Sequence, residues 1–382
     1  MYLVLRCSLT TKKSTRKAFL MKVRGFEIPE EAFLVAADLL DQLTGINAKT
    51  ITRVALDEEQ AYHTIFVSKG FGKGRRRLDI PNSELRHVQK GLLRSCLYHA
   101  GGLWSAEDWH ALTGFRVGKS IVNNIEPHLG SNAFFQLDLA DAFPSVTTEM
   151  LRETLEVLFE RSTVKRMFRF KDVRWFRKAF LQEKKGMRVL FLDLAQPTDV
   201  LWALREIIIM LTTFEGKLPQ GAPTSPHLFN MTVESQGVVS LVKRCLEGFK
   251  TAEPFVVTVY ADNITISTAA TDISEAVRTA VIEVVNGETS FRIKPEKTRY
   301  WVLKRGSGRV TGLSIGTKSG KTFVTIPQQL QRRTRGLLHS AIFDKKLRSQ
   351  ALGMVAFLRD VYGDTLPNQI ENPYQRLMSV IG

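Results

Sequence analysis

The alternation of apolar and polar positions predicts both strands and helices in this chain. Residues 134–139 form an apolar run of strand length, and residues 255–267 hold two β-rich runs around Tyr260-Ala261-Asp262-Asn263, which predicts a hairpin. Apolar residues at helical spacing predict helices within 30–43 and 327–351, the second with arginines on its outer face.

Two aspartates in these apolar segments are candidate metal ligands. Asp138 lies inside the predicted strand 134–139, where a carboxylate is costly unless it binds a metal or pairs with a base. Asp141 follows the strand and is well placed as a structural helix cap. Asp262 taken alone is an ordinary turn residue. Together with Asp138, it would place two carboxylates on adjacent strand ends, as a two-Mg²⁺ site for phosphoryl transfer requires.

Glycine and proline mark three kinds of loop. Residues 218–226 form a rigid loop before a predicted helix, and Gly221 would allow the backbone to approach a ligand closely. Residues 72–81 form a basic hairpin suited to holding phosphates.

The segments 114–120 and 316–322 look like nucleotide-binding P-loops, but each has three residues between its glycines where the motif needs four. We therefore predict loops or hairpin turns there and exclude an ATPase.

The positive charge of the chain is concentrated in patches. There are 54 Lys and Arg against 38 Asp and Glu, a formal net charge of +16. Residues 161–190 hold eleven cations against two acids, interleaved with five aromatic residues, and residues 327–351 hold six against one. Such a patch can grip a phosphate backbone and stack on bases, although 161–190 also fits an amphipathic helix with a solvated basic face. The patches favour a nucleic-acid partner, and no apolar run reaches the ~18 residues of a membrane span.

Four of these segments together resemble reverse transcriptases, in order and in spacing. They are Leu-Asp-Leu-Ala-Asp-Ala-Phe-Pro-Ser at 137–145, Leu-Pro-Gln-Gly-Ala-Pro-Thr-Ser-Pro at 218–226, Tyr-Ala-Asp-Asn at 260–263 and Phe-Arg-Ile-Lys-Pro-Glu-Lys-Thr-Arg at 291–299. Two further strings resemble the retron branch of the bacterial enzymes. They are Asn124-Ile125-Glu126-Pro127-His128, with Ile where that branch carries Ala, and Val310-Thr311-Gly312.

The resemblance implies an α+β right-hand polymerase fold, with fingers, a palm built on an antiparallel sheet, and a thumb. We expect an N-terminal helical extension over 1–70, fingers over 71–136, a palm over 137–315 with a basic-aromatic insertion at about 151–216, and a thumb over 316–382. That leaves no room for a ribonuclease H, maturase or integrase domain and suits a small standalone bacterial enzyme. Three widely spaced cysteines fit a cytoplasmic location.

The resemblance also assigns roles at the reaction centre. Asp138 and Asp262 would hold two Mg²⁺ ions, with Mn²⁺ as an alternative, and the backbone carbonyl of Leu139 would be a further ligand. Lys297 would donate a proton to the leaving pyrophosphate or attract it, unless it is a plain surface lysine. The implied nucleotide-binding residues are Phe143 as a steric gate against a ribose 2′-OH, Gln220 and Gly221 at the base pair, and Arg76 and Lys73 at the triphosphate.

Further residues are expected to contact nucleic acid, although His128 also fits a structural histidine. They are Asn124, His128, Lys165, Arg166, Arg169, Thr311, Gly312, Arg332, Arg333 and Arg335.

One position departs from the family pattern. The hairpin of the family ends in two aspartates, and here Asn263 replaces the second. An amide oxygen can ligate a metal but carries no charge. We expect activity to survive, with an altered metal preference.

The implied reaction is RNA-templated DNA synthesis from dNTPs. A retron-type enzyme would copy a structured non-coding RNA from a guanosine 2′-OH, giving the branched RNA–DNA hybrid called msDNA. The implied role is anti-phage defence with an effector or toxin protein and no membrane partner. The alternatives are another standalone bacterial defence reverse transcriptase, or a catalytically weak polymerase fold that serves as an RNA-binding scaffold.

Overall fold

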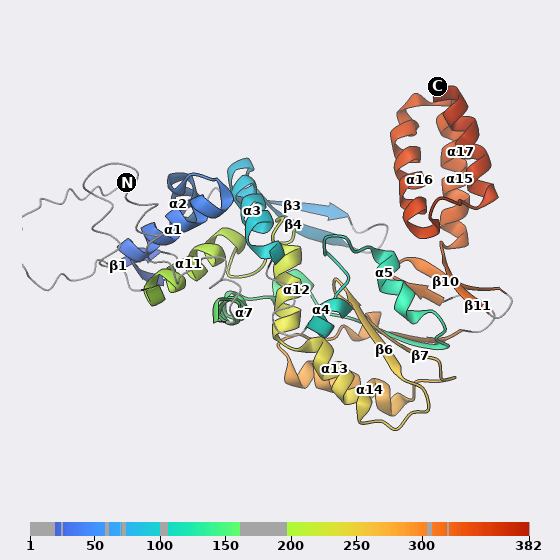
Figure 1. Ribbon diagram of the computed structural model, residues 1–382, viewed down its shortest axis with the longest axis horizontal. Coiled ribbons are helices and arrows are strands. Elements are labelled where there is room, and N and C mark those ends of the chain that lie inside the picture. The colour runs from blue at the N-terminus through green and yellow to red at the C-terminus, as the bar shows by residue number, and fades with distance from the viewer. Residues whose placement is uncertain are drawn as a thin grey trace, which may run out of the picture.

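A computed structural model describes residues 20–23, 26–57, 61–68, 70, 74–99, 106–160, 197–303, 308–318 and 321–381. The expected α+β class is confirmed, since helices surround small antiparallel sheets (Figure 1). The basic-aromatic stretch 161–190, with Lys165, Arg166 and Arg169, lies outside the described residues, as does Lys73.

A four-stranded antiparallel sheet forms the palm. Its strand order is β6-β7-β5-β8, with β5 at Ala133–Asp138, β6 at Phe255–Tyr260, β7 at Asn263–Thr268 and β8 at Arg299–Val302. The predicted strand and hairpin are thus confirmed. Side chains of β5 alternate between two cores: Phe135 and Leu137 join the main core, and Phe134 joins a second core shared with the thumb.

Helices around the palm complete the main core. α13 (Val238–Glu247) packs on α14 (Glu275–Glu288) and on β6. α12 (Ser225–Ser235) begins with Pro226 in its first turn, as the sequence predicts. The shorter helices are α4 (Ala106–Ala111), α5 (Ile121–Ile125) and α6 (Ala142–Ser145). Residues 114–120 form the loop before α5, as predicted.

The expected N-terminal extension and fingers together combine a long hairpin with a layer of helices. β3 (Tyr62–Ser68) pairs in antiparallel register with β4 (Arg75–Pro81). The helices are α1 (Glu30–Thr44), α2 (Ala48–Leu56) and α3 (Ser83–Ser95). The segment 1–70, expected to be helical, also contains β3 and the strands β1 (Leu20–Val23) and β2 (Phe26–Pro29). The run Thr64-Ile65-Phe66-Val67 in β3 consists of strand-favouring residues, which explains the difference.

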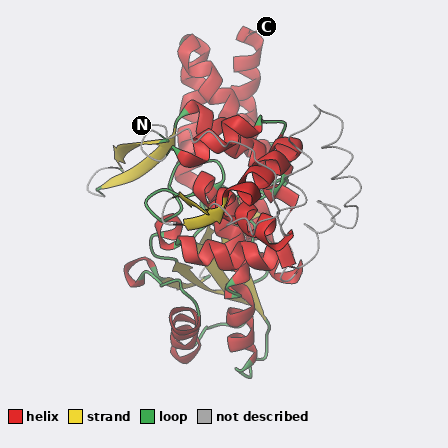
Figure 2. Ribbon diagram, turned by 90° about the vertical axis from the view of Figure 1, so that its left-hand side faces the viewer, coloured by secondary structure: helices red, strands yellow, loops and turns green. Residues whose placement is uncertain are grey.

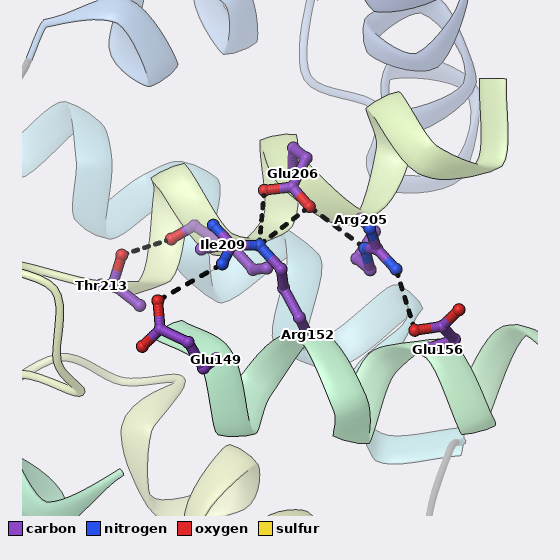
Figure 3. A network of polar contacts seen from close by, with 7 residues as sticks. All are labelled: Glu149, Arg152, Glu156, Arg205, Glu206, Ile209 and Thr213. Carbon is purple, nitrogen blue, oxygen red and sulfur yellow. Dashed lines mark hydrogen bonds and ion pairs between the residues drawn. The ribbon is translucent and has the colours of Figure 1, made fainter. Parts of the chain in front are cut away.

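Helices α7 (Thr148–Glu160) and α11 (Pro197–Thr212) are joined by a network of ion pairs (Figure 3). Glu206 of α11 is buried, with 1% of its side chain exposed, and accepts hydrogen bonds from Nε of Arg152 at 3.2 Å and Nε of Arg205 at 3.1 Å. Each arginine also reaches an acid on α7, Glu149 or Glu156. The network therefore fastens the two helices between which residues 161–196 are inserted.

The C-terminal region, which includes the expected thumb, has a three-stranded sheet followed by three helices. The strands are β9 (Gly308–Val310), β10 (Leu313–Lys318) and β11 (Lys321–Thr325), and the helices are α15 (Gln328–Phe343), α16 (Arg348–Tyr362) and α17 (Asn368–Ile381). Segment 316–322 thus falls in the β10–β11 hairpin, as predicted. Figure 1 shows the three helices set apart at one end of the molecule, and in Figure 2 they again project beyond the rest. In the part of the chain described, no helix has the length and apolar character to cross a membrane.

Candidate active site

The two candidate carboxylates lie at one edge of the palm sheet. Asp138 is the last residue of β5, and Asp262 lies in the turn between β6 and β7. The backbone N–H of Leu139 donates to the carbonyl of Asp262 at 2.7 Å, which ties the turn to the end of β5. Asp138, Leu139 and Asp262 all line a cavity of about 360 Å³. The sequence therefore placed both carboxylates at the same site.

The electrostatics of this edge favour a cation. Burial raises the pKa of the Asp262 carboxyl, and the negative charge of Asp138 raises it further. Asp138 Oδ1 is paired with Lys297 Nζ at 2.7 Å, and Asp262 Oδ1 accepts a hydrogen bond from Nδ2 of Asn263 at 3.1 Å. A cation bound close to both carboxylates would relieve the repulsion that raises the pKa of Asp262.

The donor set fits Mg²⁺. Carboxylate and carbonyl oxygens from Asp138, Asp262 and Leu139 are ligands that this ion prefers, with water and substrate phosphates completing its coordination. Within the described ranges no cluster of three or more His, Cys, Asp or Glu side chains could hold a metal. Ion binding here would therefore depend on oxygens of the backbone and the substrate as well as the two aspartates.

The same cavity brings together most of the described residues predicted to bind the nucleotide. Arg76, Phe143 and Gln220 line it together with the carboxylates. The neighbouring Arg77 forms ion pairs with Asp79 and Glu215, whereas Arg76 forms none with the described residues. Arg75 also lines the cavity and has no ion pair with the described residues, so both arginines have their charge available for an anionic ligand.

Gly221 has a different role from the expected one. It does not line the cavity, and its φ of +135° lies in the region that favours glycine. A Cβ atom at this position would lie 2.9 Å from the carbonyl oxygen of Asp79. The N–H of Asp79 donates to the carbonyl of Gln220 at 2.9 Å. The glycine therefore lets the proline-rich loop dock on strand β4, and that docking presents Gln220 to the cavity.

Phe143 is held by neighbouring rings. It packs edge-on against Phe229, with ring centroids 5.7 Å apart, and lies 5.9 Å from Phe115. Phe115 also lines the cavity and was missed from the sequence, because no role was assigned to any residue of the segment 114–120 in which it lies.

Asn124 and His128 are interior residues, which corrects the expectation that they contact nucleic acid. Both are fully buried. The ring nitrogens of His128 hydrogen-bond to Ser267 Oγ at 2.6 Å and Thr258 Oγ1 at 2.8 Å, and burial lowers its pKa to about 4. The histidine is therefore a neutral structural group that joins two strands of the palm.

Asn124 connects the two strings that resemble the retron branch. Its Oδ1 accepts from Thr113 Oγ1 at 2.8 Å, and its Nδ2 donates to Thr311 Oγ1 at 3.3 Å. Thr311 and Gly312 have positive φ values of 47° and 86° and form the turn between β9 and β10. Asn124 thus positions a turn that is itself accessible.

A second cavity of about 510 Å³ lies beside the first and shares Asp138 and Lys297 with it. Thr311 and Gly312 line it, as do two basic residues that the sequence did not single out, Arg299 and Arg309. Arg299 lies in β8, which pairs with the distant strand β5, whereas Arg309 lies in β9, which pairs with the next strand β10. The thumb residues Arg332, Arg333 and Arg335 are exposed on α15, while Leu338 on its other face is buried, as predicted.

An antiparallel sheet with two carboxylates at one edge is the arrangement that the resemblance to reverse transcriptases led us to expect. The chain is 28% identical over 346 residues to the retron Mx162 reverse transcriptase of Myxococcus xanthus, covering 85% of this chain and 64% of that protein. It is 28% identical over 303 residues to the retron Mx65 reverse transcriptase of the same organism, with 78% and 61% covered. It is 23% identical over 324 residues to the retron Ec86 reverse transcriptase of Escherichia coli, with 84% and 83% covered.

These three similarities extend over most of the chain. The chain spans less than two thirds of the length of the two Myxococcus proteins. No protein-family model matches it. Among solved structures, telomerase from Candida albicans in complex with a fragment of telomeric RNA aligns with a TM-score of 0.40 and 12% identity, covering 90% of this chain and 59% of that one.

Proposed function

We propose that this protein is an RNA-directed DNA polymerase of retron type. The observation that carries the proposal is the placement of Asp138 and Asp262 on one cavity with Arg76, Phe143 and Gln220. A cavity that holds these two carboxylates together with several cationic side chains matches a nucleoside triphosphate whose phosphates are bound through metal ions. The similarity to retron reverse transcriptases gives the substrate class.

Each residue then has a defined task. Asp138 and Asp262 would hold two Mg²⁺ ions, which when bound activate the primer hydroxyl and neutralise charge at the reacting phosphate. Arg76 would orient the triphosphate, and the ring of Phe143 would exclude a ribose 2′-OH. Lys297 holds a proton on Nζ beside Asp138, where it can be given to the leaving pyrophosphate.

The retron assignment adds a partner and a role. The template would be a structured non-coding RNA, primed from a guanosine 2′-OH in the bacterial cytoplasm to give msDNA. The product and its RNA would act in anti-phage defence with an effector protein. Sequencing of the nucleic acid that co-purifies with the protein tests this part. We expect one branched RNA–DNA species, and a random mixture of cellular RNA would contradict the retron assignment.

Primer extension on an RNA template with Mg²⁺ tests the activity itself. We expect dNTP incorporation by the wild type and a loss of at least about 10²-fold in Asp262→Asn, because an electrostatic group at the reacting centre is removed. Asp364→Asn removes the same charge from an exposed position beyond α16 and should leave the rate unchanged. RNA binding without any incorporation by the wild type would identify a scaffold instead of an enzyme.

A further inference from the structure

The basic end of strand β4 extends beyond its buried part. Asp79 is buried, whereas residues 75–77, all of them arginine, are exposed. Strands β3 and β4 form a separate two-stranded sheet, and a hairpin of this size is only marginally stable by itself. Side-chain contacts with other parts of the protein must therefore hold the arginines in place.

Arg77 makes such contacts. Its Nε donates a hydrogen bond to Asp79 Oδ1 at 2.8 Å, and its Nη2 forms an ion pair with Glu215 Oε2 at 3.0 Å. Its guanidinium carbon lies 5.8 Å from the centroid of the Phe214 ring. The hydrogen bonds to Glu215 and Asp79 raise the pKa of Arg77. Although Arg77 lines the cavity of the two catalytic carboxylates, its charge is thus already engaged.

Glu215 lies in a turn that does not favour glutamate. Glu215 and Gly216 are the central residues of a two-residue turn, which is closed by backbone hydrogen bonds of 2.9 and 3.1 Å between Phe214 and Lys217. Both central residues have positive φ values, 50° and 72°. Such turns prefer Asn-Gly, and a residue other than glycine is uncommon at positive φ. The glutamate therefore points to a function of its carboxylate beyond forming the turn.

The backbone of this turn is attached to the start of α7. The carbonyl of Gly216 accepts hydrogen bonds from the backbone N–H of Thr148 at 3.1 Å and from its Oγ1 at 2.9 Å. The turn leads directly into residues 218–226, the loop that presents Gln220 to the cavity. Glu215 therefore contacts strand β4 from a backbone position that is itself held by another element.

We propose that Glu215 is a positioning residue for the incoming nucleotide, which holds strand β4 through Arg77 so that Arg76 faces the triphosphate. This inference rests on the proposed polymerase function. Successive side chains of a strand point to opposite faces, so fixing Arg77 also fixes the rotation of the strand and the direction of Arg76. Burial raises the pKa of the Asp262 carboxyl, and the charge of Arg76 is among those that lower it, which places this arginine near the reaction centre.

The Michaelis constant for dNTP tests the proposal. Glu215→Asn removes the carboxylate and suits the turn, so the variant should fold as stably as the wild type. We expect KM for dNTP to rise about fivefold, the scale of one exposed ion pair. The change in kcat should stay below about twofold, because a contact that affects only binding is weakened.

The matched control is Glu107→Asn. Glu107 is also exposed, with 84% of its side chain accessible, and also forms one ion pair, with Lys243 at 3.3 Å. This control should keep the KM of the wild type. An unchanged or lowered KM in Glu215→Asn, or the same rise in Glu107→Asn, would overturn the proposal.

Double variants test whether Glu215 acts through the two arginines. In an Arg77→Gln background, Glu215→Asn should raise KM no further, because the ion pair is already lost. In an Arg76→Gln background it should also add nothing, because the group that it positions is absent. A full further rise in either background would refute the positioning role. Arg77→Gln alone should raise KM too, which keeps the proposal testable if Glu215→Asn does not fold.

Calorimetric titration with inorganic triphosphate in Mg²⁺ gives a measurement without catalysis. We expect Glu215→Asn to bind it about fivefold more weakly than the wild type does, and Glu107→Asn to bind it equally well. Equal affinity in Glu215→Asn would refute the positioning role even if the wild type is an active polymerase. A wild type that shows the expected binding pattern yet incorporates no nucleotide would refute the polymerase function and leave the role of Glu215 standing.

Discussion

We expect Phe143 to set the sugar selectivity of the proposed site. Phe143 lines the cavity beside the carboxylates and is packed against Phe115 and Phe229. A ring held from two sides has little freedom to move away from a ligand, so it can exclude a 2′-OH by volume alone. Phe115 and Phe229 would therefore contribute to the proposed gate by holding the ring of Phe143 in place.

Replacing this ring should relax the selectivity. In Phe143→Ala we expect the ratio of ribonucleotide to deoxynucleotide incorporation to rise about tenfold or more, a typical effect of opening space in a binding pocket. Steady-state incorporation of rNTPs and dNTPs gives the ratio. Phe343→Ala makes the same change at an exposed position of the thumb and should leave the ratio unaltered. If both variants keep the wild-type ratio, Phe143 is not the gate.

The sequence predicted those residues whose role follows from their immediate neighbours in the chain. It did not predict residues whose role depends on segments far away in the sequence. Asp138 was found because a carboxylate in an apolar strand is costly, and the hairpin turn marked Asp262. The burial of Asn124 could not be foreseen, because its partner Thr311 lies 187 residues away. For Gly221 the need for glycine was correct, but the close neighbour is Asp79 of strand β4 and not a ligand.

At the scale of elements, the ion-pair network of α7 and α11 is the main polar feature outside the active site. Glu206 is buried between Arg152 and Arg205, as Figure 3 shows. Removing one member of a buried ion pair is costly, because the remaining charge is left buried without a partner. The network therefore matters to stability mainly when one of its members is lost. The hydrophobic pattern predicted helical segments, but it gave no sign of this pairing, because the participating residues are on different helices.

We expect Glu206→Ala to lower the free energy of unfolding by about 3 kcal/mol, since it leaves two partly buried guanidinium groups without their shared acid. Urea denaturation followed by circular dichroism measures the change. Glu149→Ala removes an acid with 71% of its side chain exposed from the same network and should cost less than about 1 kcal/mol. Similar urea midpoints for Glu206→Ala and Glu149→Ala would show that the burial of Glu206 does not add to the stability of the protein.

At the scale of the whole molecule, positive charge is placed where a nucleic acid would run. Cationic residues line both cavities, and Arg332, Arg333 and Arg335 are exposed along α15 of the thumb. The net charge of +16 therefore has a definite distribution around the carboxylates. Composition alone showed only that the net charge is positive. Which cationic residues share a surface depends on the fold.

Duplex binding should consequently be strongly dependent on salt. If about six to ten side chains meet phosphates, affinity should fall by ~10³–10⁵ between 50 and 200 mM salt. Changing Arg332, Arg333 and Arg335 together to Ala should lower the slope by about 0.9 for each phosphate that these arginines neutralise. Binding isotherms over a salt series give both values. A slope equal to that of the wild type would place the α15 arginines outside the interface.

The ion pairs between α7 and α11 have a consequence for variation in the length of the sequence that joins the two helices. Arg152 of α7 pairs with Glu206 of α11, and Arg205 of α11 pairs with Glu156 of α7, so ion pairs join the two helices on either side of residues 161–196. Doubling a connection between fixed ends costs only about 0.6 kcal/mol in closure entropy. The contact between the two helices should therefore tolerate changes in the length of the sequence between them.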